Sequence, residues 1–391
     1  MRLLTYIIIA IAAGIGAGFI LPEWAARLSA TFNALFGSLL AFVIPLLIVG
    51  FVAPAIADTG RRAGAMLATT VAVAYAMTFA SGAAAYLTAD AIFPALLSGE
   101  HATAAAATAG TAPAPFFAID IPPLMGVTAA LALAFLLGFG TAALPAAAPL
   151  RAVLDDFRSI IKTVITKVII PLLPFYIFGI FMSMTMAGTV APVLATFAKI
   201  IAVIFVLHIV VLLAQYGVAS LFSGINPLRA LRTMLPAYFT ALGTQSSAAT
   251  IPVTLERTIA MGVDRNVAGF VVPLCATIHM SGSTLKIVAC AIALMIVNGM
   301  PYSPAMFAAF IAALGVTIIA APGVPGGAIM ASLGLLASVL GFSETDCAMM
   351  IALYIAMDSF GTACNITGDG AIAQIVGRLF RKATPEAMAD A

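Results

Sequence analysis

Long apolar runs, separated by short polar or basic segments, dominate the first part of the chain. A helix that crosses a membrane needs about 20 mostly apolar residues. Runs of that kind predict six spans, at residues 3–21, 34–57, 64–88, 124–148, 168–188 and 195–222. The first run starts at Leu3 and is followed by further spans, so we interpret it as a retained first helix and not as a cleaved signal peptide.

The pattern changes after residue 228, where apolar pieces are interrupted by polar and Gly/Pro clusters. Two similar units follow each other, and each has a small-residue tip, GTQSSAATIP at 243–252 and APGVPGGAIM at 321–330. Each tip precedes a helix with a polar interruption, TIHMSGST at 277–284 and DSFGTACNITGD at 358–369. Paired broken segments of inverted topology indicate the substrate site of a transporter. Glycine and serine at the tips leave backbone N–H groups that could hold an anion.

Basic residues orient the chain, because cytoplasmic loops of membrane proteins carry an excess of lysine and arginine. The basic positions that we place in the cytoplasm are Arg2, Arg61, Arg62, Arg151, Arg158, Lys162, Arg229, Arg232, Arg378, Arg381 and Lys382. This orientation puts both termini in the cytoplasm, with residues 377–391 as a tail. Residues 98–115, which are small, polar and Pro-containing, form an external loop.

Composition supports a multi-pass membrane protein. Of the 391 residues, 63% are hydrophobic and only 8% are charged, whereas soluble proteins are about a quarter charged. The net charge of +2 gives no indication of a nucleic-acid partner. The four cysteines lack zinc spacing and are interpreted as small buried hydrophobic residues, so no cofactor is predicted.

One polar stripe stands out near the end of the chain. Asp358, Thr362, Asn365 and Asp369 are spaced by four, three and four residues, which places them on one face of a helix. Carboxylates within a membrane are costly and need a partner or a function. An interhelical hydrogen-bonding seam is the structural alternative. Carboxylate and carbonyl oxygens suit a cation such as Na⁺, and a carboxylate also suits a substrate ammonium.

Four ordered motifs carry a family resemblance: SSAATIPVT, PLCATIHMSGST, PGVPGGA and DSFGTACNITGD. With them, the whole chain resembles the dicarboxylate/amino-acid:cation symporters, the glutamate transporter family, as an atypical bacterial-type member. The resemblance implies an all-α membrane protein with eight transmembrane helices, two re-entrant helical hairpins and inverted repeats. It also implies a homotrimer in the cell (inner) membrane that works as an elevator. Scaffold spans would lie at about 1–60 and 120–190, transport-domain spans at about 64–90 and 195–227, and the transport core at 228–376.

The resemblance also implies a substrate site. Backbone groups at the two tips, with the amide of Asn365, would hold the substrate α-carboxylate, and Asp358 would take the α-ammonium. The implied substrate-binding residues are Ser246, Ser247, Ser283, Val324, Asp358, Gly361, Thr362 and Asn365. Pro325 and Gly326 would belong to the second hairpin, which gates the external side.

A cation site is implied beside the substrate. Asp369 and Asn365, with backbone carbonyls, would bind Na⁺, and Tyr75 and Thr78 in the run AYAMT resemble the third span's contribution to another sodium site. The predicted coupling ion is therefore Na⁺.

Three departures from the family pattern affect substrate and ion. Members with acidic substrates have an arginine at the place of Gly361, and some have one at the place of Gln245 instead. Without a guanidinium to pair with a side-chain carboxylate, a neutral amino acid is the simpler substrate.

The second departure is the run His279-Met280-Ser281-Gly282-Ser283, where the family has Asn-Met-Asp-Gly-Thr. Ser281 replaces a sodium-ligating aspartate, so one sodium site has lost its charge. His279 is either neutral and packed or carries a proton in place of a sodium ion, which makes H⁺ the alternative coupling ion.

The third departure is Lys286, inside an apolar helix. A lysine there could pair with Asp358 or extend to an interface. It could also replace a bound cation, or supply the charge that Gly361 lacks, which would restore an acidic amino acid or dicarboxylate as substrate.

Other function classes explain less. A hydrolase could be drawn from Ser246 or Ser247 with His279 and Asp358, but a nucleophile-elbow context is missing and the repeat would need a separate explanation. A channel is a second alternative, because pores also use broken polar helices. We therefore predict a secondary active symporter and not an enzyme.

Overall fold

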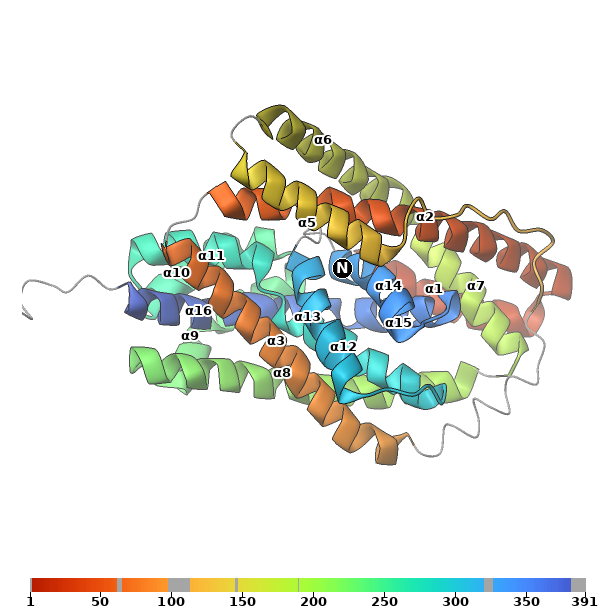
Figure 1. The fold of residues 1–391 in the computed structure, drawn as a ribbon. Coiled ribbons are helices and arrows are strands. Elements are labelled where there is room, and N and C mark those ends of the chain that lie inside the picture. Colours follow the sequence, from red (N-terminus) through yellow and green to blue (C-terminus); the bar gives the residue numbers. More distant parts are fainter. Residues whose placement is uncertain are drawn as a thin grey trace, which may run out of the picture.

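The computed structural model describes residues 2–61, 65–97, 113–144, 147–188, 190–319 and 326–380. Within these ranges every extended regular element is a helix (Figure 1). Val324 and Pro325, which the sequence placed at the second tip, lie outside the described residues.

Each predicted span of the first part falls on a helix. These helices are α1 (Arg2–Ile20), α2 (Glu23–Arg61), α3 (Ala65–Leu96), α5 (Val127–Ala143), α7 (Ile170–Met186) and α8 (Val190–Ser223). The ends differ most for α2 and α3, which extend past the predicted spans into polar sequence. A helix propagates one hydrogen bond per residue once it has formed, so a drop in hydropathy does not end it.

One described helix of the first part lies almost entirely outside the predicted spans. Helix α6 (Ala148–Val164) joins α7 through a short π-helical segment, η2 (Ile165–Ile169). Leu154 and Ile161 are seven residues apart and are both buried, while charged residues occupy the other side. This amphipathic pattern gives a helix without the continuous apolar run that a span search requires.

The second part consists of four consecutive helix pairs. They are α9 (Pro227–Thr244) with α10 (Ser247–Ala260), α11 (Arg265–Ile278) with α12 (Ser281–Val297), α13 (Pro304–Ile319) with α14 (Gly327–Leu340), and α15 (Glu344–Ala356) with α16 (Asp358–Leu379). The breaks fall at the tips and polar interruptions that the sequence indicated. Helices α15 and α16 meet at an angle of 63°.

Side chains define several of these helix ends. Asn226 caps α9 and Asp264 caps α11, each by accepting hydrogen bonds from two backbone N–H groups. Gln245 ends α9 with a left-handed backbone (φ 53°), which turns the chain into α10. Ser343 and Asp346 form a reciprocal capping box at the start of α15.

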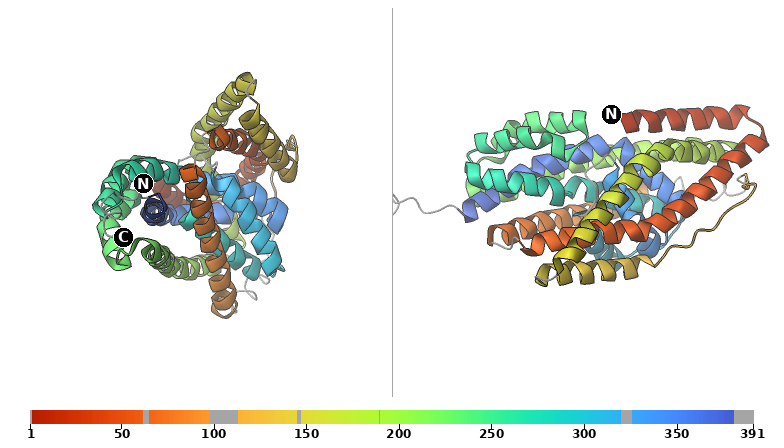
Figure 2. Two further views of the ribbon diagram at one scale, coloured as in Figure 1. Left: turned by 60° about the vertical axis from the view of Figure 1, so that its left-hand side comes forward. Right: turned by 90° about the horizontal axis from the view of Figure 1, so that it is seen from above.

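The helices form two groups by their packing. In the first, α1 packs on α7, and α2 packs on α5, α6 and α7. In the second, α16 contacts α3, α8, α9, α10, α11 and α12, and Figure 2 shows it end-on with α8 to α11 around it (left view). All residues of α12 from Ser281 to Ile296 are buried. The helices with the polar interruptions are therefore interior elements.

The outer surface fits a lipid environment. Five described helices are long and apolar enough to cross a membrane, and a sixth span results if the bent pair α15–α16 counts as one. Large apolar side chains lie exposed on the outside, such as Leu221 (85% exposed) and Ile20 (82%). With apolar helices of this number, the chain is a multi-pass membrane protein.

Candidate functional site

The predicted polar stripe of α16 is buried, which confirms that part of the prediction. Asp358 is 5% exposed, Thr362 8%, Asn365 3% and Asp369 0%. The stripe faces α12, which approaches α16 closely because both helices have a glycine at the contact. A Cβ atom on Gly282 would lie 2.6 Å from the carbonyl oxygen of Gly361. The stripe is therefore pressed against the interruption between α11 and α12.

Asn365 caps α12 from the neighbouring helix. Its Oδ1 accepts hydrogen bonds from the backbone N–H groups of Gly282 (2.8 Å) and Ser283 (3.3 Å). Its Nδ2 donates to the Ser283 hydroxyl at 3.1 Å. Since α12 has no capping side chain of its own, Asn365 supplies the acceptor that its first turn needs. In this arrangement the Asn365 amide is engaged within the protein.

Asp369 pairs with His279, the residue at the end of α11. The His279 Nδ1 lies 2.9 Å from Asp369 Oδ1 and 3.2 Å from the backbone oxygen of Asn365. The backbone oxygen only accepts hydrogen bonds, and so does the carboxylate when it is ionised, so we assign the proton to Nδ1. The other polar atoms of the pair, Asp369 Oδ2 and His279 Nε2, have no hydrogen-bond partner among the described residues.

Gln215 of α8 adds to this end of the stripe. A Cβ atom on Gly368 would lie 2.5 Å from His279 Cε1 and 2.6 Å from Gln215 Oε1, so both side chains close over Gly368. Both amide atoms of Gln215 are buried without a partner in the described part of the chain. Sequence reasoning missed Gln215. Its signal was a second polar residue seven positions after His208, on the same face of an otherwise apolar span.

At the other end of the stripe, both oxygens of Asp358 are bonded. Asp358 Oδ1 lies 3.3 Å from the Lys286 ammonium, and Oδ2 accepts a hydrogen bond from the backbone N–H of Gly326 at 2.8 Å. Gly326 precedes α14 and has φ +76°, a conformation that favours glycine. Asp358 thus connects α12 to the start of α14.

Tyr354 of α15 completes this end and was also missed from the sequence. Its hydroxyl donates to the Ser283 hydroxyl at 3.0 Å, and the Lys286 nitrogen lies 3.6 Å from the centre of its ring. Its signal was weak, because it precedes Asp358 by one helical turn but lies on the other side of the break at Met357.

Of the two predicted residues of α3, Thr78 lies at the interruption between α11 and α12, whereas Tyr75 contacts α13. The Thr78 hydroxyl accepts a hydrogen bond from the backbone N–H of Met280 at 3.3 Å. The Tyr75 hydroxyl donates to the backbone oxygen of Ala312 at 2.9 Å. Beside them, Ser81 donates to the backbone oxygen of Ser281 at 2.9 Å. Helix α3 thus closes this side of the break.

The first tip is less closely tied to the stripe. Ser246 and Ser247 are partly exposed, and the Ser246 hydroxyl accepts a hydrogen bond from the Ala249 N–H at 3.3 Å. Gln245 is buried at the end of α9. Helices α9 and α10 both pack on α16. The tip residues therefore belong to the same helix cluster as the stripe.

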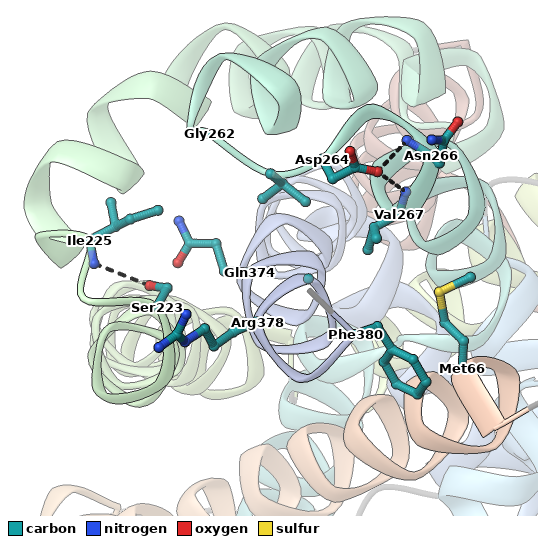
Figure 3. A pocket seen from close by; sticks show the side chains of 12 residues that line it. Met66, Ser223, Ile225, Gly262, Asp264, Asn266, Val267, Gln374, Arg378 and Phe380 are labelled. Carbon is teal, nitrogen blue, oxygen red and sulfur yellow. Dashed lines mark hydrogen bonds between the residues drawn. The ribbon is translucent and has the colours of Figure 1, made fainter. Parts of the chain in front are cut away.

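A pocket of about 820 Å³ opens at the far end of α16 (Figure 3). Gln374 and Arg378 of α16, Ser223 of α8 and Asp264 before α11 line it. None of the stripe residues contributes to it. The pocket is therefore separate from the buried stripe, which remains the candidate site.

Comparison with known proteins gives a family match over nearly the whole chain. The model of the sodium:dicarboxylate symporter family matches residues 3–379. An excitatory amino acid transporter of Caenorhabditis elegans is 31% identical over 238 residues, which cover 57% of this chain and 46% of that protein. Human excitatory amino acid transporter 1 is 32% identical over 210 residues, which cover 53% and 38% of the two chains. The alignments thus span less than half the length of these relatives.

Proposed function

Since the chain belongs to the sodium:dicarboxylate symporter family, whose members are transporters and not enzymes, we propose that it takes up a small carboxylate-bearing solute together with a cation. The observation that carries the proposal is the buried stripe of α16 pressed against the interruption of α11–α12. Two carboxylates in the membrane interior are retained where a substrate or ion pathway needs them.

Helix lengths support eight spans and two re-entrant hairpins. Helices α9 and α10 have 18 and 14 residues, and α13 and α14 have 16 and 14. At 1.5 Å per residue none exceeds about 27 Å, which is short of the roughly 30 Å hydrocarbon thickness. We therefore propose that both pairs enter the membrane and return. The six spans that length and composition allow become eight when α1 and α5 are added; with 19 and 17 residues these two are about as long as α9, so the family resemblance, and not their length, supports counting them as spans.

The two packing groups support an elevator mechanism. In this proposal α1, α2, α5 and α7 belong to the scaffold, while α3, α8 and the four helix pairs move with the substrate. The homotrimer, the cell membrane location and the cytoplasmic termini are proposed from the family and from the distribution of basic residues.

For the coupling ion, we propose the Asp369 end of the stripe. Asp369 Oδ2, the backbone oxygen of Asn365 and Gln215 Oε1 are oxygen donors of the kind that hard cations prefer. Sodium is the first candidate because of the family. A proton is the second, because His279 Nδ1 already contacts the backbone oxygen of Asn365, which is one of these donors, and the other carboxylate oxygen of Asp369. A further cation position beside Tyr75 and Thr78 would have Ser281 in place of a carboxylate.

For the substrate, two alternatives arise from the sequence. A neutral amino acid is favoured by the missing arginine at Gly361, and an anion with Lys286 as counter-charge is favoured by the burial of Lys286 next to Gly361. The relatives' names refer to excitatory amino acid transport, so amino acids remain among the candidate substrates to be tested.

The test is uptake of radiolabelled solutes into proteoliposomes under an imposed Na⁺ gradient and, separately, an imposed proton gradient. We expect saturable accumulation that one of the two gradients drives. Accumulation driven only by protons would assign proton coupling to the Asp369–His279 end of the stripe, where His279 replaces the asparagine of the family pattern. Flux that neither gradient drives, or that does not saturate, would contradict symport and favour a channel.

A further inference from the structure

The Lys286 ammonium has a complete set of protein partners. The side chain is fully buried, with 0% exposure. Its nitrogen lies 3.3 Å from the backbone oxygen of Met357, 3.3 Å from Asp358 Oδ1 and 3.6 Å from the centre of the Tyr354 ring. An ammonium has three N–H donors, and two oxygens and one ring face account for all three. Lys286 therefore has no donor left for a substrate carboxylate in this arrangement.

Gly361 makes room for this lysine. A Cβ atom at position 361 would lie 2.5 Å from both Cε and Nζ of Lys286, closer than side-chain atoms pack. Any side chain at 361 therefore competes with Lys286 for the same space. The glycine on α16 leaves the space that the lysine side chain of α12 occupies. The positive charge in the site is therefore carried by α12 and not by α16.

Asp358 is occupied from both sides. Lys286 holds Oδ1 and the Gly326 N–H holds Oδ2. A substrate ammonium at this carboxylate would bring a second positive charge next to the buried ammonium of Lys286. Its entry would require Lys286 to give up a buried ion pair, which is strongly unfavourable.

We propose that Lys286 is a specificity residue that fills, from within the chain, the place of a substrate ammonium, so that the site selects small carboxylates without an α-amino group. This inference rests on the proposed transport function and narrows its substrate class. It favours mono- or dicarboxylates over both neutral and acidic amino acids.

The first experiment compares matched ligand pairs that differ only in the ammonium group. Aspartate is compared with succinate, alanine with propionate, and serine with 3-hydroxypropionate. Binding to the purified wild-type protein is measured by ligand-induced thermal stabilisation and by competition with a transported radiolabelled carboxylate. We expect at least one amine-free ligand to bind about a hundredfold more tightly than its amino partner, as for sites that reject an unpaired polar group. Equal or tighter binding of the amino partners would overturn the inference and leave the proposed symport intact. Absence of binding and uptake for every ligand would overturn both.

The second experiment removes the internal ammonium. In Lys286→Met the side chain becomes one heavy atom shorter and loses its charge, so Asp358 becomes available to a ligand. We expect the preference to shift by at least about tenfold towards the amino partner of each pair. The matched control is Lys162→Met, the same change at an exposed position of α6, which should leave the preference unchanged.

A carboxylate without its partner could prevent Lys286→Met from folding. The double variant Lys286→Met/Asp358→Asn removes both charges and keeps the pair's approximate volume. We expect it to bind amine-free carboxylates and to lose the discrimination against amino partners. A preference that stays at the wild-type ratio in either folded variant would show that Lys286 does not set it, and would overturn the inference.

Discussion

The two ends of the α16 stripe contain the same elements, a buried aspartate and a basic residue from the α11–α12 segment, yet they differ in how completely they are satisfied. At the Asp358 end both carboxylate oxygens are bonded, and all donors of Lys286 have partners. At the Asp369 end one carboxylate oxygen and one imidazole nitrogen have no partner among the described residues.

This difference indicates different tasks. A buried polar group without a partner costs about 1–3 kcal/mol, so several at one place indicate a site that a mobile ion or proton completes. A self-sufficient pair does not require an exogenous charge. We infer that ion coupling belongs to the Asp369 end and that the Asp358 end defines the substrate.

The largest expected effect is at the ion end. Asp369→Asn removes the carboxylate that His279 contacts at 2.9 Å and leaves a neutral group in its place. Loss of one partner of a buried pair costs about 3–5 kcal/mol, equivalent to roughly 10²–10⁴-fold. We expect cation-driven uptake in proteoliposomes to fall by at least about a hundredfold, while the order of substrate preference is kept.

The control for Asp369→Asn is Asp155→Asn, which removes a half-exposed carboxylate paired with Arg158 on α6. Surface pairs contribute about 0–1 kcal/mol, so uptake should be nearly unchanged. If the cation dependence of uptake were unchanged in Asp369→Asn, Asp369 would not belong to the ion site. The proposed difference in function between the two ends of the stripe would then be wrong.

The next effect concerns the stability of the Lys286–Asp358 pair. Each single change, Lys286→Met or Asp358→Asn, leaves one buried charge or polar group unmatched and should lower the free energy of unfolding by about 3 kcal/mol. The double variant should lose much less than the sum of the two. The measurement is a double-mutant cycle by unfolding in mixed detergent micelles. Additive losses would mean that the two side chains do not act as a pair.

Much of the arrangement could be predicted from local sequence. The spacing of Asp358, Thr362, Asn365 and Asp369 predicted one helical face, and the polar interruptions predicted the breaks. Periodicity and turn chemistry are local properties, so a single chain reveals them.

What the sequence left open depends on contacts between distant segments. Lys286 had several alternative roles, and only the approach of α12 to Gly361 and Asp358 distinguishes among them. Gln215 lies more than 150 residues before Asp369, and nothing in its own span indicates which helix it faces. The capping of α12 by Asn365 likewise joins two helices that share no sequence pattern.

Substitutions at Gly361 should have an intermediate effect on ligand binding, and they test the Asp358 end of the stripe directly. Gly361→Arg alone would place a long side chain in the space of Lys286, and we expect ligand binding to fall by at least about tenfold, since overpacking costs about 1–3 kcal/mol. In Gly361→Arg/Lys286→Ala the space is free, Asp358 can take an ammonium, and the arginine can pair with a second carboxylate. This double variant should prefer aspartate over both succinate and alanine in competition binding. A preference for succinate in it would show that another group sets selectivity.

The smallest expected effect tests whether Tyr354 acts through its ring or through its hydroxyl. Tyr354→Phe keeps the ring beneath Lys286 and removes the hydrogen bond to Ser283, so the free energy of unfolding should fall by only about 1 kcal/mol. Tyr354→Leu also removes the ring face, which contributes about 2 kcal/mol when a cation is desolvated, and should weaken discrimination against amino ligands. The matched control is Tyr176→Phe on α7, in the first helix group. It removes the hydroxyl of a buried tyrosine that donates to the Glu344 backbone oxygen, so it should lower stability without changing ligand preference. If Tyr354→Phe and Tyr354→Leu had equal effects on that preference, the ring would not be holding the ammonium, and Lys286 would depend on Asp358 and the Met357 oxygen alone.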